Sequence, residues 1–454
     1  MINSIIQTII ENKDFLEKSL EECIKSNEIS MFSRNLRKVF DEAGRKTLVG
    51  ILETIDTILF ENPKRKLEYE TKDLRKRTLV TEYGNIEYTR RYYRNKQTKE
   101  YIYLVDEKMG IEKNERITKD VESKIIEFAH DISYRKTGRK VVGNEIISPT
   151  TVMHKVRKEE LKVEVQEEKK QIKRLYIEAD EDHVSERGNK IGMPKLIYVH
   201  EGNYRKGKRN ILKNVHYIGC LGKNSEDLWL EVAEYIDKKY DIKTIEKVYI
   251  GGDGAGWIKE GLNWIEKSEF VLDKFHLLKY INQATVDFPQ YKSKLWYNIN
   301  IYDLISVENI FKEIIEKTED EKRKEKVKES YKYIKNQWKG IEIYDTDSQY
   351  LKGCSAEGHI SHVYADRMSS RPRTWSDDGI DKMSRLRVFV SNGGKIYEEL
   401  IKSKKVNTKL KKYDRIIERH FKKGIEEPSH YAFSVINTGM HSNINKIFKK
   451  IMYG

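Results

Sequence analysis

Apolar side chains recur at intervals of three and four residues through the first sixty residues of the chain. One set consists of Ile5, Ile6, Ile9 and Ile10, and a second set runs through residues 48–59. Side chains with this spacing lie on one face of a helix. The sequence therefore predicts an amphipathic helical lead-in whose apolar face is used for packing or for oligomerisation.

Residues 79–94 alternate between apolar and polar side chains, and the alternation is interrupted at Gly84 and Asn85. Such a pattern is typical of a β-hairpin, so residues 1–112 are expected to combine helices with a hairpin. The second strand of this hairpin interleaves arginine and tyrosine at 90–94. That composition suits phosphate contacts and base stacking, and it equally suits a solvated strand face.

A helical pattern returns between residues 117 and 160 and is broken at Gly143 and Asn144. Ser148 is a suitable N-cap, and Pro149 suits the first position of the helix that follows. We therefore expect a helix-turn-helix in a DNA-binding region at 113–165, with an ordinary helical hairpin as the alternative. In a helix-turn-helix the second helix lies in the major groove, and here it would present Thr151, Lys155, Arg157 and Lys158.

Strands and helices alternate between residues 172 and 273. Three predicted strands (174–184, 195–202 and 214–222) precede a helix at 226–240, a strand at 245–254, a short helix, and a strand at 268–273. Alternation of this kind predicts the α/β class. The order of the elements is that of a ribonuclease-H-like mixed sheet, so residues 172–273 are expected to form the first part of a catalytic core.

The chain changes character after this core. Residues 274–350 are charged and helical in pattern, and they are too many for a loop in a compact domain. They therefore predict a helical insertion. Residues 351–454 would then complete the core and add C-terminal helices.

The charge balance indicates a class of partner. Of the 454 residues, 87 are Lys or Arg and 73 are Asp or Glu, a formal net charge of +14. This excess favours a polyanion such as DNA, although a basic surface that is only solvated has the same composition. Three scattered cysteines provide neither a disulfide framework nor a paired-cysteine zinc motif. Without a membrane span or a signal peptide in the sequence, we expect a cytoplasmic protein with no membrane partner.

Two aspartates stand at the ends of predicted strands of the core, Asp180 after the first and Asp253 after the fourth. Ligands of open α/β sheets collect at the carboxyl ends of strands, where neighbouring carboxylates share a proton or bind cations. Oxygen ligands without a Cys/His cluster favour Mg²⁺ or Mn²⁺, and two such ions can promote phosphodiester displacement. Asp182 lies on the same strand face as Asp180 and is an alternative first carboxylate.

A third carboxylate would complete such a metal site. The best candidate is Glu357, on a predicted helix. His359 on the same helix either positions DNA or is a hydrogen-bonded structural residue. Arg367, Arg371 and Arg373 follow the helix and are expected to contact DNA phosphates.

Four passages carry a resemblance to a known family: LYIEADEDHV, YIGGDGAGWIK, FVLDKFHLLKYI and GCSAEGHISHVYADRMSSRPRTWS. Through them the whole chain resembles the ISLre-type insertion-sequence transposases, which are related to the Mutator-like DDE transposases and were long catalogued only as an uncharacterised bacterial family. The resemblance implies that Asp180, Asp253 and Glu357 form the DDE triad. It also implies that Asp273 and His276, which are similar to the Asp/Cys-x-x-His signature of that class, support the active site and DNA.

The expected function is that of a DNA transposase. Such an enzyme binds the terminal inverted repeats of its element, cleaves the DNA with two Mg²⁺ or Mn²⁺ ions, and joins the freed 3′-hydroxyl to target DNA. Lys274 would help to neutralise phosphates, and the joining of two ends implies a homodimer or a larger synaptic complex at the nucleoid. Two other hypotheses stay open: a non-enzymatic sequence-specific DNA-binding protein or inactive transposase remnant, and a ribonuclease-H-like nuclease.

Overall fold

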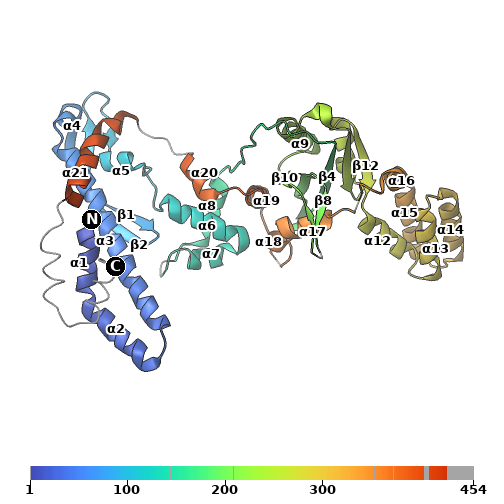
Figure 1. Cartoon of the computed structure of the whole chain (residues 1–454), viewed down its shortest axis with the longest axis horizontal. Coiled ribbons are helices and arrows are strands. Elements are labelled where there is room, and N and C mark those ends of the chain that lie inside the picture. The colour runs from blue at the N-terminus through green and yellow to red at the C-terminus, as the bar shows by residue number, and fades with distance from the viewer. Residues whose placement is uncertain are drawn as a thin grey trace. The chain divides into compact units, whose positions relative to one another are not determined.

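The computed structural model describes residues 2–143, 146–207, 209–351, 353–371, 373–402 and 408–426 (Figure 1). The chain divides into two compact units. The first comprises Met1–Lys155 and Ile396–Gly454, and the second comprises Val156–Lys395. Residues 427–454, the last part of the range 351–454 that was predicted to complete the core and add C-terminal helices, lie outside the described residues.

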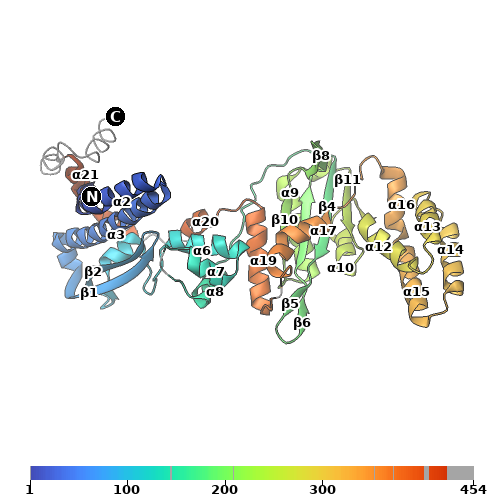
Figure 2. The ribbon, with the colours of Figure 1, turned by 90° about the horizontal axis from the view of Figure 1, so that it is seen from below.

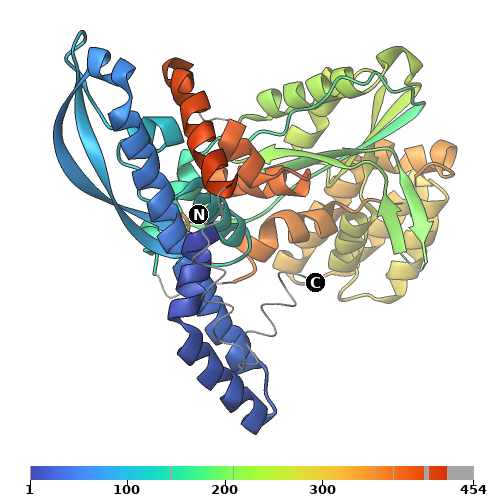
Figure 3. The ribbon, with the colours of Figure 1, turned by 60° about the vertical axis from the view of Figure 1, so that its left-hand side comes forward.

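Helices open the first unit, as the apolar spacing predicts. Helices α1 (Ile2–Glu11) and α2 (Lys13–Ser26) both pack against the long helix α3 (Ser30–Glu61), and Figure 3 shows them along it. Helix α4 (Pro63–Glu68) follows, with the side chain of Asn62 accepting a hydrogen bond from the Lys64 amide. The predicted helical lead-in is confirmed.

The predicted hairpin is also confirmed, but its first strand is longer than expected. Strand β1 (Tyr69–Thr81) pairs with β2 (Gly84–Asn95), and β3 (Tyr101–Ile102) extends the sheet. The charged stretch 70–77 belongs to β1 because it pairs along β2 while most of its side chains stay exposed. The hairpin packs its apolar face on α3, where Leu59, Leu79 and Tyr88 belong to one core.

A buried charge cluster joins this hairpin to helix α5 (Leu104–Met109). Asp106 accepts hydrogen bonds from Arg77 Nη1 at 2.6 Å and from the Tyr88 hydroxyl at 2.7 Å, and it also pairs with Arg90. All four side chains are buried. Arg90, one of the hairpin arginines that were expected to suit DNA contacts, is therefore buried and paired with Asp106.

Helices α6 (Lys119–Asp131), α7 (Tyr134–Lys140) and α8 (Pro149–Lys158) follow the hairpin. Ser148 Oγ accepts a hydrogen bond from the Thr151 amide at 3.0 Å, which confirms the predicted N-cap. A Cβ atom on Gly138 would lie 1.9 Å from the carbonyl oxygen of Ile147, so only glycine permits this close approach. The predicted turn includes Asn144, which lies outside the described residues.

The C-terminal part of the first unit contributes helix α20 (Ile396–Lys402), which packs on α6, and helix α21 (Asp414–Glu426). Leu410 and Tyr413, in the 3₁₀-helix that precedes α21, belong to the core around α3. In the part of the chain that the structure describes, no helix combines the length and apolar character needed to cross a membrane.

A five-stranded mixed sheet forms the centre of the second unit. Its strand order is β10 (His216–Cys220), β7 (Lys195–His200), β4 (Arg174–Glu181), β11 (Lys247–Gly252) and β12 (Ser268–Leu272). Strands β4, β11 and β12 are parallel to one another, and β7 is antiparallel to both β4 and β10. The predicted strands and the α/β class are confirmed.

Helices cover this sheet on both faces (Figure 2). Leu175, Ile177 and Ala179 of β4 belong to the core that includes Leu228 and Trp229 of α9 (Ser225–Lys239). The short helices α10 (Gly256–Lys259) and α11 (Gly261–Trp264) follow β11. On the other side α17 (Ala356–Ile360) contacts β4, and α19 (Asp377–Ser391) contacts β10.

The helical insertion predicted at 274–350 is present. It consists of α12 (Lys274–Ala284), α13 (Gln290–Asn300), α14 (Leu304–Lys317), α15 (Glu321–Asn336) and α16 (Trp338–Asp347), and it has a core of its own that includes Leu295, Phe311 and Ile334. Two small hairpins within 184–212 were not predicted: β5 (Val184–Glu186) with β6 (Lys190–Gly192), and β8 (Asn203–Lys206) with β9 (Arg209–Leu212). Their strands are only three or four residues long, too short for a clear alternation.

Candidate active site

The three predicted triad residues line one cavity of about 400 Å³ in the second unit. Asp180 is near the carboxyl end of β4, and Asp253 directly follows β11. These strands are parallel neighbours, so their carboxyl ends reach the same edge of the sheet. Glu357 comes from α17, which contacts β4. The other lining residues are Glu181, Asp182, His183, His276, Lys279, Tyr280, Tyr333, Ile360, Ser361 and Ala365.

The cavity concentrates negative charge. Burial, together with the nearby charges of Asp253 and Glu357, raises the pKa of Asp180 to about 6, against the effect of a hydrogen bond from the Glu181 amide. Burial and the charge of Asp253 raise the pKa of Glu181 as well. Carboxylates so placed keep a proton to higher pH than free carboxylates do, unless a cation approaches them.

Asp180 and Asp182 both face this cavity, but their hydrogen bonds differ. Asp182 is buried, and its Oδ1 accepts hydrogen bonds from the His183 amide and from Ser369 Oγ, each at 2.9 Å. Its Oδ2 is buried without a hydrogen-bond partner in the part of the chain that the structure describes. Oδ1 of Asp182 therefore binds Ser369, which follows α17 in the chain. Among the described contacts, the side chain of Asp180 accepts a hydrogen bond only from the amide of Glu181.

Asp273 and His276 form the pair that the resemblance implied. Asp273 caps α12 by accepting a hydrogen bond from the Phe275 amide at 3.1 Å, and its Oδ2 lies 2.9 Å from His276 Nδ1. The hydrogen bond to Asp273 raises the pKa of His276, against the effect of burial, and the charges of Asp253 and Asp180 raise it further. His276 lines the acidic cavity and favours its cationic form there.

Two tyrosines of the insertion also reach the cavity, and sequence reasoning missed both. The Tyr333 hydroxyl donates to the carbonyl oxygen of Asp253 at 2.5 Å, and its ring stacks on that of Tyr280 with centroids 3.7 Å apart. Gly254, at φ +88, makes the turn after Asp253 beside Gln337. Tyr333 lies eighty residues after Asp253, so no local signal could have connected the two.

Several residues predicted to contact DNA lie away from the cavity. Arg367 is buried, 3% exposed, with its guanidinium over the Trp375 ring, so it packs in the interior instead of facing a phosphate. His359 is a structural residue, because its Nδ1 lies 2.7 Å from the Tyr217 hydroxyl and burial lowers its pKa. Arg371 is exposed, Arg373 is half-buried and donates to the Arg367 carbonyl oxygen, and exposed Lys274 lies over the Tyr344 ring.

Basic residues of the predicted recognition helix α8 make contacts within the protein. Lys155 Nζ lies 2.8 Å from the buried carboxylate of Glu122, and Arg157 donates to Ser376 Oγ at 2.6 Å and pairs with Asp378. The Thr151 hydroxyl contacts that of Ser148. Thr150, His154 and Lys158 are exposed, so these residues form the solvent face of the helix.

Residues 24–405 match the model of the uncharacterised protein family UPF0236. The chain belongs to this family. A UPF0236 protein of Caldanaerobacter subterraneus subsp. tengcongensis is 42% identical over 437 residues, which are 94% of each chain. A second from the same organism, whose name joins eleven gene designations, is 41% identical over 98% of this chain and 95% of its own length. The UPF0236 protein in the vanSb 3′ region of Streptococcus gallolyticus is 24% identical over 386 residues.

The donor chemistry of the cavity in this UPF0236 chain fits a hard divalent cation. Carboxylate oxygens are the ligands that Mg²⁺ and Mn²⁺ prefer. The buried Oδ2 of Asp182 has no hydrogen-bond partner among the described residues, and burial and the charges of Asp253 and Glu357 raise the pKa of Asp180. Within the described residues, no three His, Cys, Asp or Glu side chains are grouped closely enough to hold a metal ion. The carboxylates would therefore have to approach one another to bind one.

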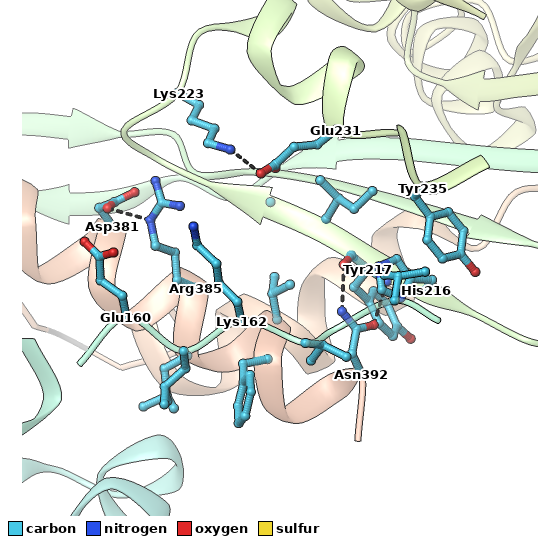
Figure 4. A pocket seen from close by; sticks show the side chains of 18 of the residues that line it. Glu160, Lys162, His216, Tyr217, Lys223, Glu231, Tyr235, Asp381, Arg385 and Asn392 are labelled. Atoms are coloured by element: carbon cyan, nitrogen blue, oxygen red, sulfur yellow. Dashed lines mark hydrogen bonds and ion pairs between the residues drawn. The ribbon is translucent and has the colours of Figure 1, made fainter. Parts of the chain in front are cut away.

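A second cavity, of about 680 Å³, lies beside the edge strand β10 (Figure 4). Four of its charged residues form two pairs, Lys223 with Glu231 and Arg385 with Asp381. The side chain of Asn392 makes hydrogen bonds of 2.8 Å to both the amide and the carbonyl of Tyr217. Asn392 therefore occupies backbone groups of the edge strand β10. The acidic cavity is the better candidate for an active site.

Proposed function

We propose that this UPF0236 chain is a DDE transposase of a bacterial insertion sequence, which binds terminal inverted repeats and catalyses metal-dependent DNA cleavage and strand transfer. One observation carries the proposal: Asp180, Asp253 and Glu357 come from three distant parts of the chain and line a single acidic cavity. A structural role would not require three carboxylates at one site, because neighbouring like charges destabilise the folded state. A catalytic site for phosphodiester chemistry does require them.

The topology of the sheet supports this proposal. The order β10, β7, β4, β11, β12, with only β7 antiparallel to its neighbours, is the arrangement expected for a ribonuclease-H-like core. Asp180 and Asp253 lie at the carboxyl ends of parallel strands, where open α/β sheets bind their ligands. The helical insertion then enters after β12 and brings Tyr333 to the site.

Each residue of the site has a proposed role. Asp180 and Asp253 would hold the metal ions together with Glu357, with Asp182 as the alternative first ligand, and Mg²⁺ or Mn²⁺ would supply activation of the attacking oxygen and stabilisation of the leaving oxygen. His276 and Lys279 place positive charge in the same cavity, where it would attract the DNA phosphate. Tyr333 fixes the backbone at Asp253 through its hydrogen bond.

Two further observations favour a mobile element. The passages that resemble ISLre-type transposases contain all three acids and the Asp273–His276 pair. In addition, the name of one relative joins eleven gene designations from one organism, as expected of a protein encoded by many copies of an element. Because two element ends have to be joined, we propose that the chain acts at the nucleoid as a homodimer or larger complex.

For DNA binding we propose the helix-turn-helix interpretation of α7 and α8. The two helices approach closely at Gly138 and Ile147, and α8 begins at a capped, exposed N-terminus. The N-terminal residues of such a helix contact base edges. Thr150 and His154 are the exposed candidates for these contacts, and Lys158, Arg371 and Arg373 are candidates for phosphate contacts.

The experiment uses the full chain and duplexes made from the DNA that flanks its gene. We expect Mg²⁺-dependent cleavage at the element ends, which Asp253→Asn and Glu357→Gln abolish while DNA affinity stays unchanged. The matched control is Glu319→Gln, at an exposed residue between α14 and α15, which should cleave as the wild type does. Binding without cleavage in Mg²⁺ or Mn²⁺ would instead indicate a non-enzymatic DNA-binding protein, and cleavage regardless of end sequence would indicate a nuclease.

A further inference from the structure

A buried glutamate lies two residues before Asp180 on strand β4. Glu178 is 6% exposed and, two positions away along the strand, faces the same side of the sheet as Asp180. It does not line the acidic cavity. A carboxylate buried under a catalytic site needs a physical explanation, because burial of a charge is costly unless hydrogen bonds compensate for it.

Glu178 has unusually many hydrogen bonds. Its Oε2 accepts from the Ser355 amide at 2.7 Å and from Ser355 Oγ at 3.0 Å, and it also accepts from the Tyr198 hydroxyl. Its Oε1 lies 3.3 Å from His200 Nε2. The hydrogen bonds of this buried carboxylate are therefore directed at a few specific groups.

Ser355 is the residue that precedes α17, the helix of Glu357. The other end of α17 is also held to the sheet, because His359 contacts the Tyr217 hydroxyl at 2.7 Å and its ring lies 4.3 Å from that of Tyr198. Glu357 lies between these two contacts and is exposed to the cavity. The position of Glu357 therefore depends on the contacts that hold the two ends of α17 against β4, β7 and β10.

Helix α17 needs such contacts for its own order. It is five residues long and continues into a π-helical turn, Ser361–Ala365. Helices of this length are not stable by themselves, and π-turns are strained elements that occur often at functional sites. A hydrogen bond to a carboxylate oxygen fixes direction and distance more strictly than an apolar contact does.

We propose that Glu178 is a positioning residue that sets the distance between Glu357 and Asp180, so that the acidic cavity can close on a divalent cation. Strand β4 then has two functions on one face, with Asp180 in the cavity and Glu178 beneath the helix that carries Glu357. The inference rests on the proposed function, because it concerns the same three carboxylates. Sequence reasoning missed Glu178, which precedes the acidic run 180–182 in an otherwise apolar strand.

The first measurement is hydrogen exchange of the full chain without DNA. Glu178→Ala removes the acceptor for the Ser355 amide, so the segment 353–365 should exchange at least about tenfold faster while strand β7 keeps its protection. The matched control is Glu201→Ala, which removes another buried carboxylate, paired with Lys170 at 2.7 Å just after β7. This control should leave the exchange of segment 353–365 unchanged. Equal exchange of 353–365 in Glu178→Ala and wild type would overturn the inference.

The second measurement is Mn²⁺ binding, followed by electron paramagnetic resonance of the free ion. Glu178→Ala should weaken Mn²⁺ binding about tenfold, the size that loss of an outer-shell partner produces, and Glu201→Ala should not. Glu178→Gln keeps an acceptor oxygen for the Ser355 amide and should recover part of the affinity. Ser355→Ala, a milder change that keeps the amide hydrogen bond, serves if Glu178→Ala fails to fold, and it should show smaller effects in the same direction.

Cleavage assays separate this inference from the proposed function. If the wild type cleaves, Glu178→Ala should lower kcat with little change in the KM for DNA, and a variant with wild-type kcat would overturn the inference alone. If the wild type binds Mn²⁺ but does not cleave, the proposed function fails, and weaker Mn²⁺ binding by Glu178→Ala still supports the inference. If the wild type binds no Mn²⁺, both fail.

Discussion

Nδ1 of His276 lies 2.9 Å from Oδ2 of Asp273, three residues earlier at the N-terminus of α12. The same aspartate caps the helix through the Phe275 amide. One carboxylate therefore fixes both the start of the insertion and the orientation of the imidazole in the acidic cavity. The resemblance placed these two residues together by motif, and the structure gives the contact a physical cause.

The first prediction concerns the charge of His276. Asp273→Asn should lower the pKa of His276, because an opposite charge at hydrogen-bond distance is lost. The raised pKa stabilises the wild-type fold below the unfolded value of about 6.5, and this contribution is lost as the pH rises through the folded pKa. The measurement is an NMR titration of the histidine ring carbons. Asp287→Asn, at the exposed pair with Arg323, is the control and should leave the titration of His276 unchanged.

The second prediction concerns the stability cost of the site. The pKa of Asp180 is raised to about 6, so its ionisation favours the unfolded state increasingly between about pH 4 and pH 6. In metal-free buffer at pH 7.5, Asp180→Asn should therefore raise the free energy of unfolding by about 1–2 kcal/mol, and at pH 4 the gain should nearly vanish. All six tryptophans lie in the second unit, so tryptophan fluorescence in urea reports its unfolding. A destabilised variant at pH 7.5 would contradict the prediction.

The third prediction tests the buried charge cluster of the first unit. Asp106→Ala should lower the stability of this unit by about 3–5 kcal/mol, because it leaves Arg77 and Arg90 buried without their carboxylate. Asp73→Ala removes an exposed ion pair with Arg75 in the same hairpin and should cost at most about 1 kcal/mol. Circular dichroism follows the loss of the first unit. Tryptophan fluorescence should stay native at the same urea concentration, and equal costs for the two variants would refute the account.

The fourth prediction concerns DNA binding. Lys158→Ala should weaken binding to the element ends and reduce the slope of log K against log salt by about 1, the value for one phosphate contact. Arg157→Ala is less informative because it also removes the contacts with Ser376 and Asp378. Lys322→Ala, at an exposed residue of α15, is the control. Equal slopes for wild type and Lys158→Ala in fluorescence anisotropy titrations would show that Lys158 does not contact a DNA phosphate and that the DNA-contacting surface lies elsewhere.

Local patterns were sufficient where a segment's own residues decide its structure. The strand of Asp180, the N-cap at Ser148 and the helices after Asp273 follow from alternation, capping and helical spacing. The sequence did not predict the extra length of β1, because the charged stretch 70–77 forms a strand through its pairing with β2 and not through a pattern of its own. The basic residues of the predicted DNA contacts show the same limit, since Lys155, Arg157 and Arg367 have partners within the protein.

The sequence by itself determined the elements, the α/β class of the second unit, and which acids stand at strand ends, because these depend on neighbours a few residues away. Only the tertiary structure decided which side chains come together: Glu178 beneath Ser355, Tyr333 against Asp253, and Glu357 in the same cavity as Asp180. Contacts across eighty or more residues depend on how strands pair and how helices pack on them. The periodicity of apolar residues along the chain gives no information about contacts between residues so far apart in the sequence. The residues that support the site could therefore be found only in the folded molecule.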